Sequence, residues 1–340
     1  MNERYSRQER FTPIGKEGQQ KLGRKHVLLI GAGALGTGNA EALVRAGVGE
    51  LTIVDRDYVE VSNLQRQQLY SEEDARLKLP KSIAAKNRLQ AINSAVKVHT
   101  EVIDASFTEI SALAEKADLI IDATDNLDTR FMINDVAQKH SIPWIYGACT
   151  GSYGVVYTII PGKSPCLRCL WDKVITGNGY TCDTAGIISP AVSMVVSYQV
   201  TDALKILVED WEALSGKLIM FDLWNNIHNQ IGIQKLRKRD CPSCGEIPSF
   251  PALSHEQTTK ISVLCGRDTI QIRPAEKKKV NLAELEKIFA NQGYLVQRNP
   301  YMLSIHFSPH RLAVFHDGRV LVHGTNDQAE AKKYYYRIFG

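Results

Sequence analysis

Several side chains that suit phosphate and metal chemistry occur in the first 130 residues. Carboxylates accept hydrogen bonds from a ribose or hold Mg²⁺ against phosphate oxygens, whereas amide, guanidinium and ammonium groups donate to phosphate. The candidates are Asp55 and Asp57 for a ribose, Asn63, Arg66 and Lys81 as phosphate donors, and Asp125 for Mg²⁺. A helix end alone largely neutralises a pyrophosphate, so the additional cations indicate a triphosphate.

This set predicts activation of a carboxylate by ATP. An α-carboxylate has a pKa of about 3.3 to 3.7, so it is ionised at neutral pH and needs no general base to attack the α-phosphate. The attack needs alignment, screening of the repulsion between two anions and stabilisation of the leaving pyrophosphate, which Arg, Lys and Mg²⁺ supply. The products are an acyl-adenylate and pyrophosphate. An NAD-dependent dehydrogenase is the alternative, and the extra cations and the lack of a plausible hydride-site histidine argue against it.

A glycine-rich turn between a strand and a helix must position these groups. Residues 27–30 are an uninterrupted apolar run, typical of a strand buried on both faces of a parallel sheet, and a helix is expected over residues 34–46. A second strand over residues 51–54 leads into Asp55. The turn follows the pattern G-x-G-x-x-G, with Gly31, Gly33 and Gly36. The pattern predicts a nucleotide site at the amino end of the helix, although such glycines can also serve packing alone.

Two further positions have a structural alternative. Lys81 follows Pro80 at the start of a helix expected up to residue 92, where a positive charge opposes the helix dipole. A phosphate contact and a plain surface lysine are both consistent with this pattern. Asp125 and Asn126 follow a strand expected over residues 118–122, and either can cap the helix that begins near residue 127 while the other faces the ligand.

Four of the seven cysteines form two C-x-x-C pairs, Cys166 with Cys169 and Cys241 with Cys244. Four thiolates at this spacing suit a tetrahedral Zn²⁺ that ties distant parts of the chain together. Redox pairs and isolated buried cysteines are the alternatives. Cys182 lies outside these pairs in a loop rich in glycine and small polar residues, and it is either a nucleophile or an incidental cysteine.

The order of apolar strands and helices predicts an α/β fold: a doubly wound, mainly parallel sheet with a Rossmann-like nucleotide site and a structural zinc. We expect residues 1–247 to form this domain. From residue 248 the character changes, and residues 248–340 are expected to form a small α+β domain of unknown role. Its expected elements are a strand over residues 261–272, a helix over residues 282–291, a hairpin turned at Asp317-Gly318 and a final helix over residues 326–338.

Composition and charge exclude several classes of partner. The net charge of +4, with both signs interspersed, is too small to indicate nucleic acid, although it suits an acidic protein. The first residues lack the apolar core of a signal peptide, and the most apolar later stretch, residues 191–208, is interrupted by Ser, Gln, Asp and Lys. We therefore expect no membrane association and a cytoplasmic location.

The motifs resemble, in sequence order, those of the ThiF/MoeB/HesA family, relatives of the ubiquitin-activating enzymes. The resemblance covers about residues 1–247, and one departure is Ala34, where the family often has glycine. The shared motifs are Arg4-Tyr-Ser-Arg7-Gln8, the glycine-rich turn, Asp55-Arg-Asp57, Ser62-Asn-Leu-Gln-Arg66-Gln67, Pro80-Lys81, Thr124-Asp125-Asn126, the paired cysteines and Thr181-Cys182. The resemblance implies an ATP-dependent adenylyltransferase that acts on the C-terminal Gly-Gly carboxylate of a ubiquitin-like sulfur carrier protein.

The resemblance also implies roles for individual residues. Those already assigned to ribose, phosphate, Mg²⁺ and Zn²⁺ match the corresponding family positions. Arg7, which by spacing alone belongs to a solvated basic face with Arg4 and Arg10, matches an arginine that homodimers of the family insert into the site of the neighbouring subunit. Cys182 matches a loop cysteine that in some members bonds to the carboxyl end of the carrier and in others is dispensable.

The identity of the carrier is less well determined. The segment after residue 248 looks similar to the tail of the thiazole-synthesis members of Gram-positive bacteria, which favours a ThiS-like carrier over a MoaD-like carrier of molybdopterin biosynthesis. A sulfur donor protein is a further partner to expect. A non-catalytic scaffold, similar to the inactive half of the heterodimeric activating enzymes, is a third alternative, and the retained Arg7, Arg66, Lys81 and Asp125 argue against it.

Overall fold

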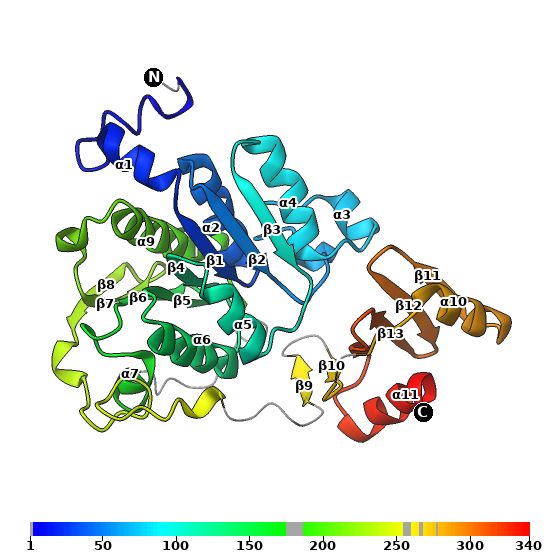
Figure 1. Cartoon of the computed structure of the whole chain (residues 1–340). Helices are drawn as coiled ribbons and strands as arrows, with labels where there is room; N and C mark the ends of the chain where they lie inside the picture. Colours follow the sequence, from blue (N-terminus) through cyan, green and yellow to red (C-terminus); the bar gives the residue numbers. More distant parts are fainter. Residues whose placement is uncertain (1–2, 175–185, 254–259, 265–267, 277) are drawn as a thin grey trace. The chain divides into compact units, whose positions relative to one another are not determined.

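The computed structural model divides the chain into two compact units (Figure 1). The first comprises Met1–Arg76, Pro80–Gly179 and Ile187–Ser254, and the second comprises Leu77–Leu79, Tyr180–Gly186 and His255–Gly340. The residues that the structure describes are 3–174, 186–253, 260–264, 268–276 and 278–340.

The first unit contains an eight-stranded sheet with the order β3-β2-β1-β4-β5-β6-β7-β8. The neighbours from β3 to β5 pair in parallel and those from β5 to β8 pair antiparallel. The chain continues on opposite sides of β1, so a topological switch point lies at its carboxyl end. The expected doubly wound, mainly parallel sheet is therefore confirmed. The strands are β1 (His26–Ile30), β2 (Glu50–Val54), β3 (Lys97–Glu101), β4 (Leu119–Asp122), β5 (Trp144–Thr150), β6 (Tyr153–Ile159), β7 (Lys217–Asp222) and β8 (Ile227–Gly232).

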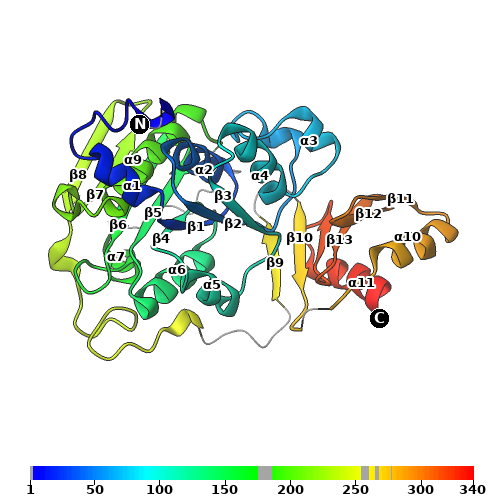
Figure 2. The ribbon, with the colours of Figure 1, turned by 45° about the horizontal axis from the view of Figure 1, so that its top comes forward.

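Helices cover both faces of this sheet, and Figure 2 shows α2 and α9 on one side of the strands with α5 and α6 on the other. This double cover explains why the central strands consist mostly of buried apolar residues. Within the described residues, no helix combines the length and the apolar character that crossing a bilayer requires. The helices are α1 (Gly15–Leu22), α2 (Ala34–Ala46), α3 (Glu72–Arg76), α4 (Lys81–Ile92), α5 (Phe107–Ala114), α6 (Leu127–His140), α7 (Leu167–Val174) and α9 (Ser189–Leu207).

Local capping signals set the helix ends next to the switch point. Gly47 ends α2 with a φ of 85°, a left-handed conformation that favours glycine. The Asn126 side chain accepts a hydrogen bond from the backbone N–H of Thr129 at 2.9 Å, so Asn126 is the residue that caps α6. Asp125 is exposed and is left for other contacts.

A buried polar contact holds α9 against the carboxyl end of β4. Gln199 Nε2 donates to the carbonyl oxygen of Asp122 at 2.8 Å, and Asn39 Nδ2 of α2 donates to Gln199 Oε1 at 2.7 Å. A Cβ on Gly147 would lie 2.4 Å from Gln199 Nε2, so only glycine leaves room for this amide. The contact ties α2, α9 and β4 together directly beneath the residues that follow β4.

The second unit contains a six-stranded antiparallel sheet with the order β11-β12-β13-β14-β10-β9, and α10 (Leu282–Asn291) and α11 (Gln328–Phe339) pack on one of its faces. The expected hairpin at Asp317-Gly318 joins β13 to β14. The expected single strand over residues 261–272 is wrong, because β9 and β10 pair antiparallel and Asp268 has a φ of 40° between them. The strands are β9 (Lys260–Leu264), β10 (Thr269–Arg273), β11 (Leu295–Arg298), β12 (Met302–Phe307), β13 (His310–Phe315) and β14 (Val320–His323).

Candidate functional site

The three glycines of the turn after β1 have different structural roles. Gly31 has a φ of 98°, and a Cβ there would lie 2.4 Å from the carbonyl oxygen of Ala123. A Cβ on Gly36 would lie 2.1 Å from the carbonyl oxygen of Gly31, so both positions serve close packing. Among the residues that the structure describes, a Cβ on Gly33 would meet Gln67 Nε2 alone, at 4.0 Å. Since no side chain of the described residues caps α2, these residues leave the space at Gly33 open in front of the first backbone N–H groups of that helix.

Asp55 fixes the shape of this turn. Its Oδ2 accepts the backbone N–H of Ala32 at 2.6 Å, and its Oδ1 accepts the backbone N–H of Asp57 at 2.7 Å. Burial raises the pKa of Asp55, while the Lys81 charge and the two N–H donors act in the opposite direction. The hydroxyl of Tyr70 donates to the carbonyl of Ala32 at 2.6 Å and holds the turn from a second point.

Lys81 is a buried lysine, with 3% of its surface exposed. Its Nζ lies 3.4 Å from Asp57 Oδ2, and its backbone N–H donates to the carbonyl oxygen of Asp57 at 2.9 Å. A buried ammonium group needs a charged partner, and Asp57 supplies it. The interpretation of Lys81 as a plain surface lysine is therefore wrong, and the structure brings it together with both acids at the end of β2.

The polar residues of the loop between Asp57 and Lys81 differ in burial and in hydrogen-bond partners. Asn63, at the end of the 3-10 helix η2 (Val61–Asn63), is buried and accepts the backbone N–H of Glu60 at 3.0 Å. The Arg66 guanidinium donates to the carbonyl oxygen of Ser62 at 2.9 Å, within its own loop. Gln67 is 3% exposed, and its Oε1 has no hydrogen-bond partner in the part of the chain that the structure describes. The amide of Gln67, rather than the guanidinium of Arg66, thus borders the space at Gly33.

Two guanidinium groups near Asp125 were not predicted from the sequence. Arg130 Nε lies 3.3 Å from Asp122 Oδ2, and its Nη2 donates to the carbonyl oxygen of Thr124 at 2.7 Å. Arg56 Nη1 lies 3.0 Å from Asp104 Oδ1. Arg56 and Asp104 follow the carboxyl ends of β2 and β3. Open α/β sheets bind ligands at the carboxyl ends of their strands, so the sequence positions of both residues could have identified them as site candidates.

Arg7 lies at the opposite edge of the sheet. The ring of Tyr5 packs against Gly47, and the Gln8 side chain donates to the carbonyl oxygen of Ala46 at 2.9 Å. Ala46 and Gly47 lie before the amino end of β2, whereas the glycine-rich turn lies at the carboxyl ends of the strands. A five-residue strand spans about 16 Å, so this distance separates the two ends. Arg7 is exposed there, beyond reach of the glycine-rich turn of its own chain. Cys182, the candidate nucleophile, lies outside the residues that the structure describes.

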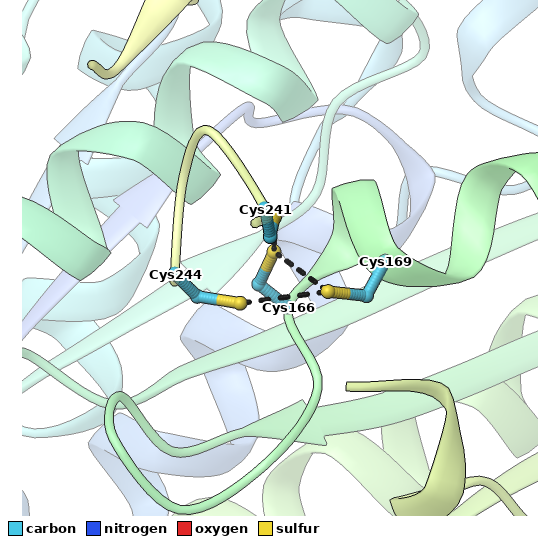
Figure 3. Close-up of side chains that lie close together, drawn as sticks. All are labelled: Cys166, Cys169, Cys241 and Cys244. Carbon is cyan, nitrogen blue, oxygen red and sulfur yellow. Dashed lines mark hydrogen bonds between the residues drawn. The ribbon is translucent and has the colours of Figure 1, made fainter. Parts of the chain in front are cut away.

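The four paired cysteines meet in one buried cluster (Figure 3). Their sulfur atoms all lie within 4.8 Å of one another and point toward a common centre. The Sγ–Sγ distances are 3.9 Å for Cys166 and Cys169, 3.6 Å for Cys166 and Cys241, and 3.5 Å for Cys169 and Cys244. A tetrahedral zinc site with Zn–S bonds of about 2.3 Å has edges of about 3.8 Å, so the cluster has the dimensions of such a site.

A polar network ties this cluster to α6. The Arg168 guanidinium donates to Ser243 Oγ at 2.9 Å, and Ser243 Oγ donates to Asp135 Oδ1 at 2.5 Å. Asp135 is fully buried in α6, and its Oδ2 accepts the backbone N–H of Ala252 at 2.9 Å. Each C-x-x-C turn thus contributes a residue to a network on the helix that begins beside Asp125.

The chain is similar to several known proteins. The model of the ThiF family matches residues 5–243. The chain is 51% identical over 340 residues to the sulfur carrier protein ThiS adenylyltransferase of Bacillus subtilis (strain 168), and the match covers 100% of both chains. It is 34% identical over 245 residues to the molybdopterin-synthase adenylyltransferase of Escherichia coli (strain K12), which is 72% of this chain and 96% of that one.

Among solved structures, that of E. coli MccB with ATP shares the fold. Its TM-score is 0.62 at 24% identity, and the match covers 72% of this chain and 75% of that one.

Replacement of Gly36 by alanine should destabilise the first unit, because the new methyl group would overlap the carbonyl oxygen of Gly31 at 2.1 Å. We expect the free energy of unfolding in urea to fall by about 1–3 kcal/mol, the usual range for overpacking. Gly33→Ala is the matched control, and its unfolding midpoint should stay close to that of the native chain. Equal midpoints for the two variants would contradict the different packing assigned to these glycines.

Proposed function

The chain belongs to the ThiF family, and from this premise we propose that it adenylylates the C-terminal Gly-Gly carboxylate of a ubiquitin-like sulfur carrier protein with Mg²⁺-bound ATP. The observation that carries the proposal is the space at Gly33 that the described part of the chain leaves open, bordered by the amino end of α2 and close to the buried Lys81–Asp57 pair. A phosphate chain fits such a space, because backbone N–H groups and an ammonium group favour negative charge.

The residues of this chain would act by binding and alignment. The α2 N–H groups and Lys81 would hold the phosphates while a carrier carboxylate oxygen bonds to the α-phosphorus. The bond from that phosphorus to the bridging oxygen breaks, and pyrophosphate leaves with the electron pair. Asp55 and Asp57 would accept the ribose hydroxyls, since each carboxylate oxygen of Asp55 keeps a lone pair beyond its backbone hydrogen bond.

Arg66 and Asp125 would complete the site. The hydrogen bond from Arg66 to the carbonyl oxygen of Ser62 is exposed, and a triphosphate would compete for the guanidinium because its oxygen atoms carry negative charge. Asp125 has an exposed carboxylate and would hold Mg²⁺, because Asn126 does the capping of α6. Mg²⁺, when bound, neutralises phosphate charge.

A ThiS-like carrier is favoured over a MoaD-like one by the extent of the two similarities. The 51% identity to the ThiS adenylyltransferase extends over the whole chain, whereas the 34% identity to the molybdopterin-synthase adenylyltransferase extends over 72% of it. Residues 248–340 are therefore shared with the former type, and we propose that they form a domain specific to it. A sulfur donor protein would consume the adenylylated carrier.

Arg7 supports a homodimer as the working form. Its exposure at the sheet edge opposite the glycine-rich turn leaves it free to enter the site of a second copy, as the family resemblance implies. A site shared in this way is incomplete in a single chain. We propose that the four-cysteine cluster holds a structural Zn²⁺, which would stabilise the fold through both C-x-x-C turns.

Carrier-dependent exchange of labelled pyrophosphate into ATP tests the reaction. We expect exchange with a ThiS-like carrier that ends in Gly-Gly and loss of exchange when this tail is removed. Asp125→Asn should lower the exchange rate by about 10²-fold, the scale of losing one charge that stabilises the transition state. Asp128→Asn, on the exposed first turn of α6, is the control and should keep the native rate. Exchange with a MoaD-like carrier alone would favour the molybdopterin alternative, and exchange with no Gly-Gly protein would reject both.

Mixing two inactive variants tests the shared site. Arg7→Ala and Lys81→Ala should each lack exchange activity, but a mixed dimer contains one site with both native residues. We expect up to a quarter of the native activity after the subunits exchange. No recovery, with exchange of subunits verified by differently tagged chains, would show that each site is built within one chain.

Loss of metal tests the cysteine cluster. Cys241→Ser should lower bound zinc from one ion per chain to nearly none, and should lower the unfolding midpoint because the buried thiolates lose their common ligand. Cys149→Ser, outside the cluster, is the matched control and should retain zinc. Elemental analysis that finds no zinc in the native chain would reject the assignment.

A further inference from the structure

Arg56 lies beside two carboxylates at the carboxyl ends of the strands, and a third, that of Asp125, follows a strand that ends on the same side of the sheet. Its Nη1 is 3.0 Å from Asp104 Oδ1, and its Nε is 4.0 Å from Asp57 Oδ1. Burial disfavours the charged guanidinium, but the charges of Asp104, Asp57 and Asp125 outweigh this and raise the pKa of Arg56. Because a guanidinium group keeps its proton in proteins, this side chain is a fixed cation at the carboxyl ends of the strands.

The three carboxylates belong to loops that follow three different strands. Asp57 follows β2, Asp104 follows β3 and Asp125 follows β4. The side chains of Asp57 and Asp104 are 17% and 15% exposed, so water screens their mutual repulsion only weakly. A cation placed among them offsets that repulsion and links the ends of neighbouring strands.

Arg130 also lies near Asp125, but its charge does not offset the repulsion among these three carboxylates. Its Nε faces Asp122, which is fully buried, and its Nη2 bonds to the backbone of Thr124. These contacts fix the turn after β4 from within. The Arg56 side chain is 21% exposed and is anchored to Asp104 in the loop after β3.

We propose that Arg56 is a positioning residue that supplies positive charge to these carboxylates before nucleotide binds, so that the site takes up ATP together with Mg²⁺ instead of binding Mg²⁺ first. The proposal rests on the proposed function, because Asp125 is the residue assigned to the metal. A fixed guanidinium repels an approaching divalent cation and attracts a triphosphate. Removal of its charge therefore has opposite effects on the two ligands.

Two binding measurements on the full-length chain separate this role from a structural one. Binding of Mn²⁺ without nucleotide is followed by the electron paramagnetic resonance signal of free Mn²⁺, and binding of ATP in EDTA is followed by equilibrium dialysis. Arg56→Met should bind Mn²⁺ about tenfold more tightly and metal-free ATP about tenfold more weakly, the scale expected for one charge within several ångströms at intermediate dielectric. Arg56→Lys keeps the charge and should resemble the native chain in both measurements.

Matched controls make the result decisive. Arg76→Met removes an exposed arginine that is bonded to Glu73, and both affinities should stay at the native values. Asp104→Asn keeps Arg56 charged but removes one carboxylate. We expect this variant to bind Mn²⁺ more weakly and to bind metal-free ATP no more weakly than the native chain. It replaces Arg56→Met in the test if Arg56→Met does not fold. A parallel fall of both affinities in Arg56→Met, or no change in either, would overturn the proposal. Binding of Mg²⁺-bound ATP and carrier-dependent exchange by the native chain test the proposed function separately.

Discussion

The carboxylate of Asp55 is the contact on which the rest of the site depends. It receives the N–H of Ala32 from the glycine-rich turn and the N–H of Asp57 from the next loop, so one side chain joins the ends of β1 and β2. Both loops then have fixed positions relative to the start of α2. The arrangement requires a buried negative charge, which is tolerable because two N–H donors and the Lys81 ammonium group oppose the effect of burial. Without that carboxylate, the hydrogen bond from the Tyr70 hydroxyl to the carbonyl oxygen of Ala32 would have to hold the turn and the loop together.

Helix α6 connects the two chemical centres of the first unit. Its amino end begins at the Asn126 cap, immediately after Asp125, and its interior carries Asp135, which bonds to Ser243 beside the cysteine cluster. The helix is rigid over this distance because its backbone hydrogen bonds are continuous. The cluster thus lies far from the glycine-rich turn in the sequence, and the helix whose interior contacts its C-x-x-C turns begins directly after Asp125 and Asn126.

Local signals in the sequence predicted the helices best. The expected bounds of α2 and α4 agree with the structure because Gly47 and Pro80 stop or start a helix by their own backbone geometry. Side-chain partners were harder to predict, since Arg66 bonds within its own loop while Gln67 borders the open space, a difference that tertiary packing decides. Arg56 and Asp104 were missed although both follow parallel strands. The strand expected over residues 261–272 failed because the apolar residues at its two ends show that each end is extended, but do not show that the chain reverses direction before Thr269.

The separation of the two C-x-x-C turns has a consequence for synthesis of the chain. Cys166 and Cys241 are 75 residues apart, so the first pair is made well before the second. At about 5–20 residues per second, a translating ribosome needs roughly 4–15 s to cover that interval. During this time two thiols are already made but have no partner pair, and β7 and β8 are made within the same interval. The last strands of the sheet are thus synthesised before the four cysteines can come together. The cysteine cluster therefore assembles late during translation.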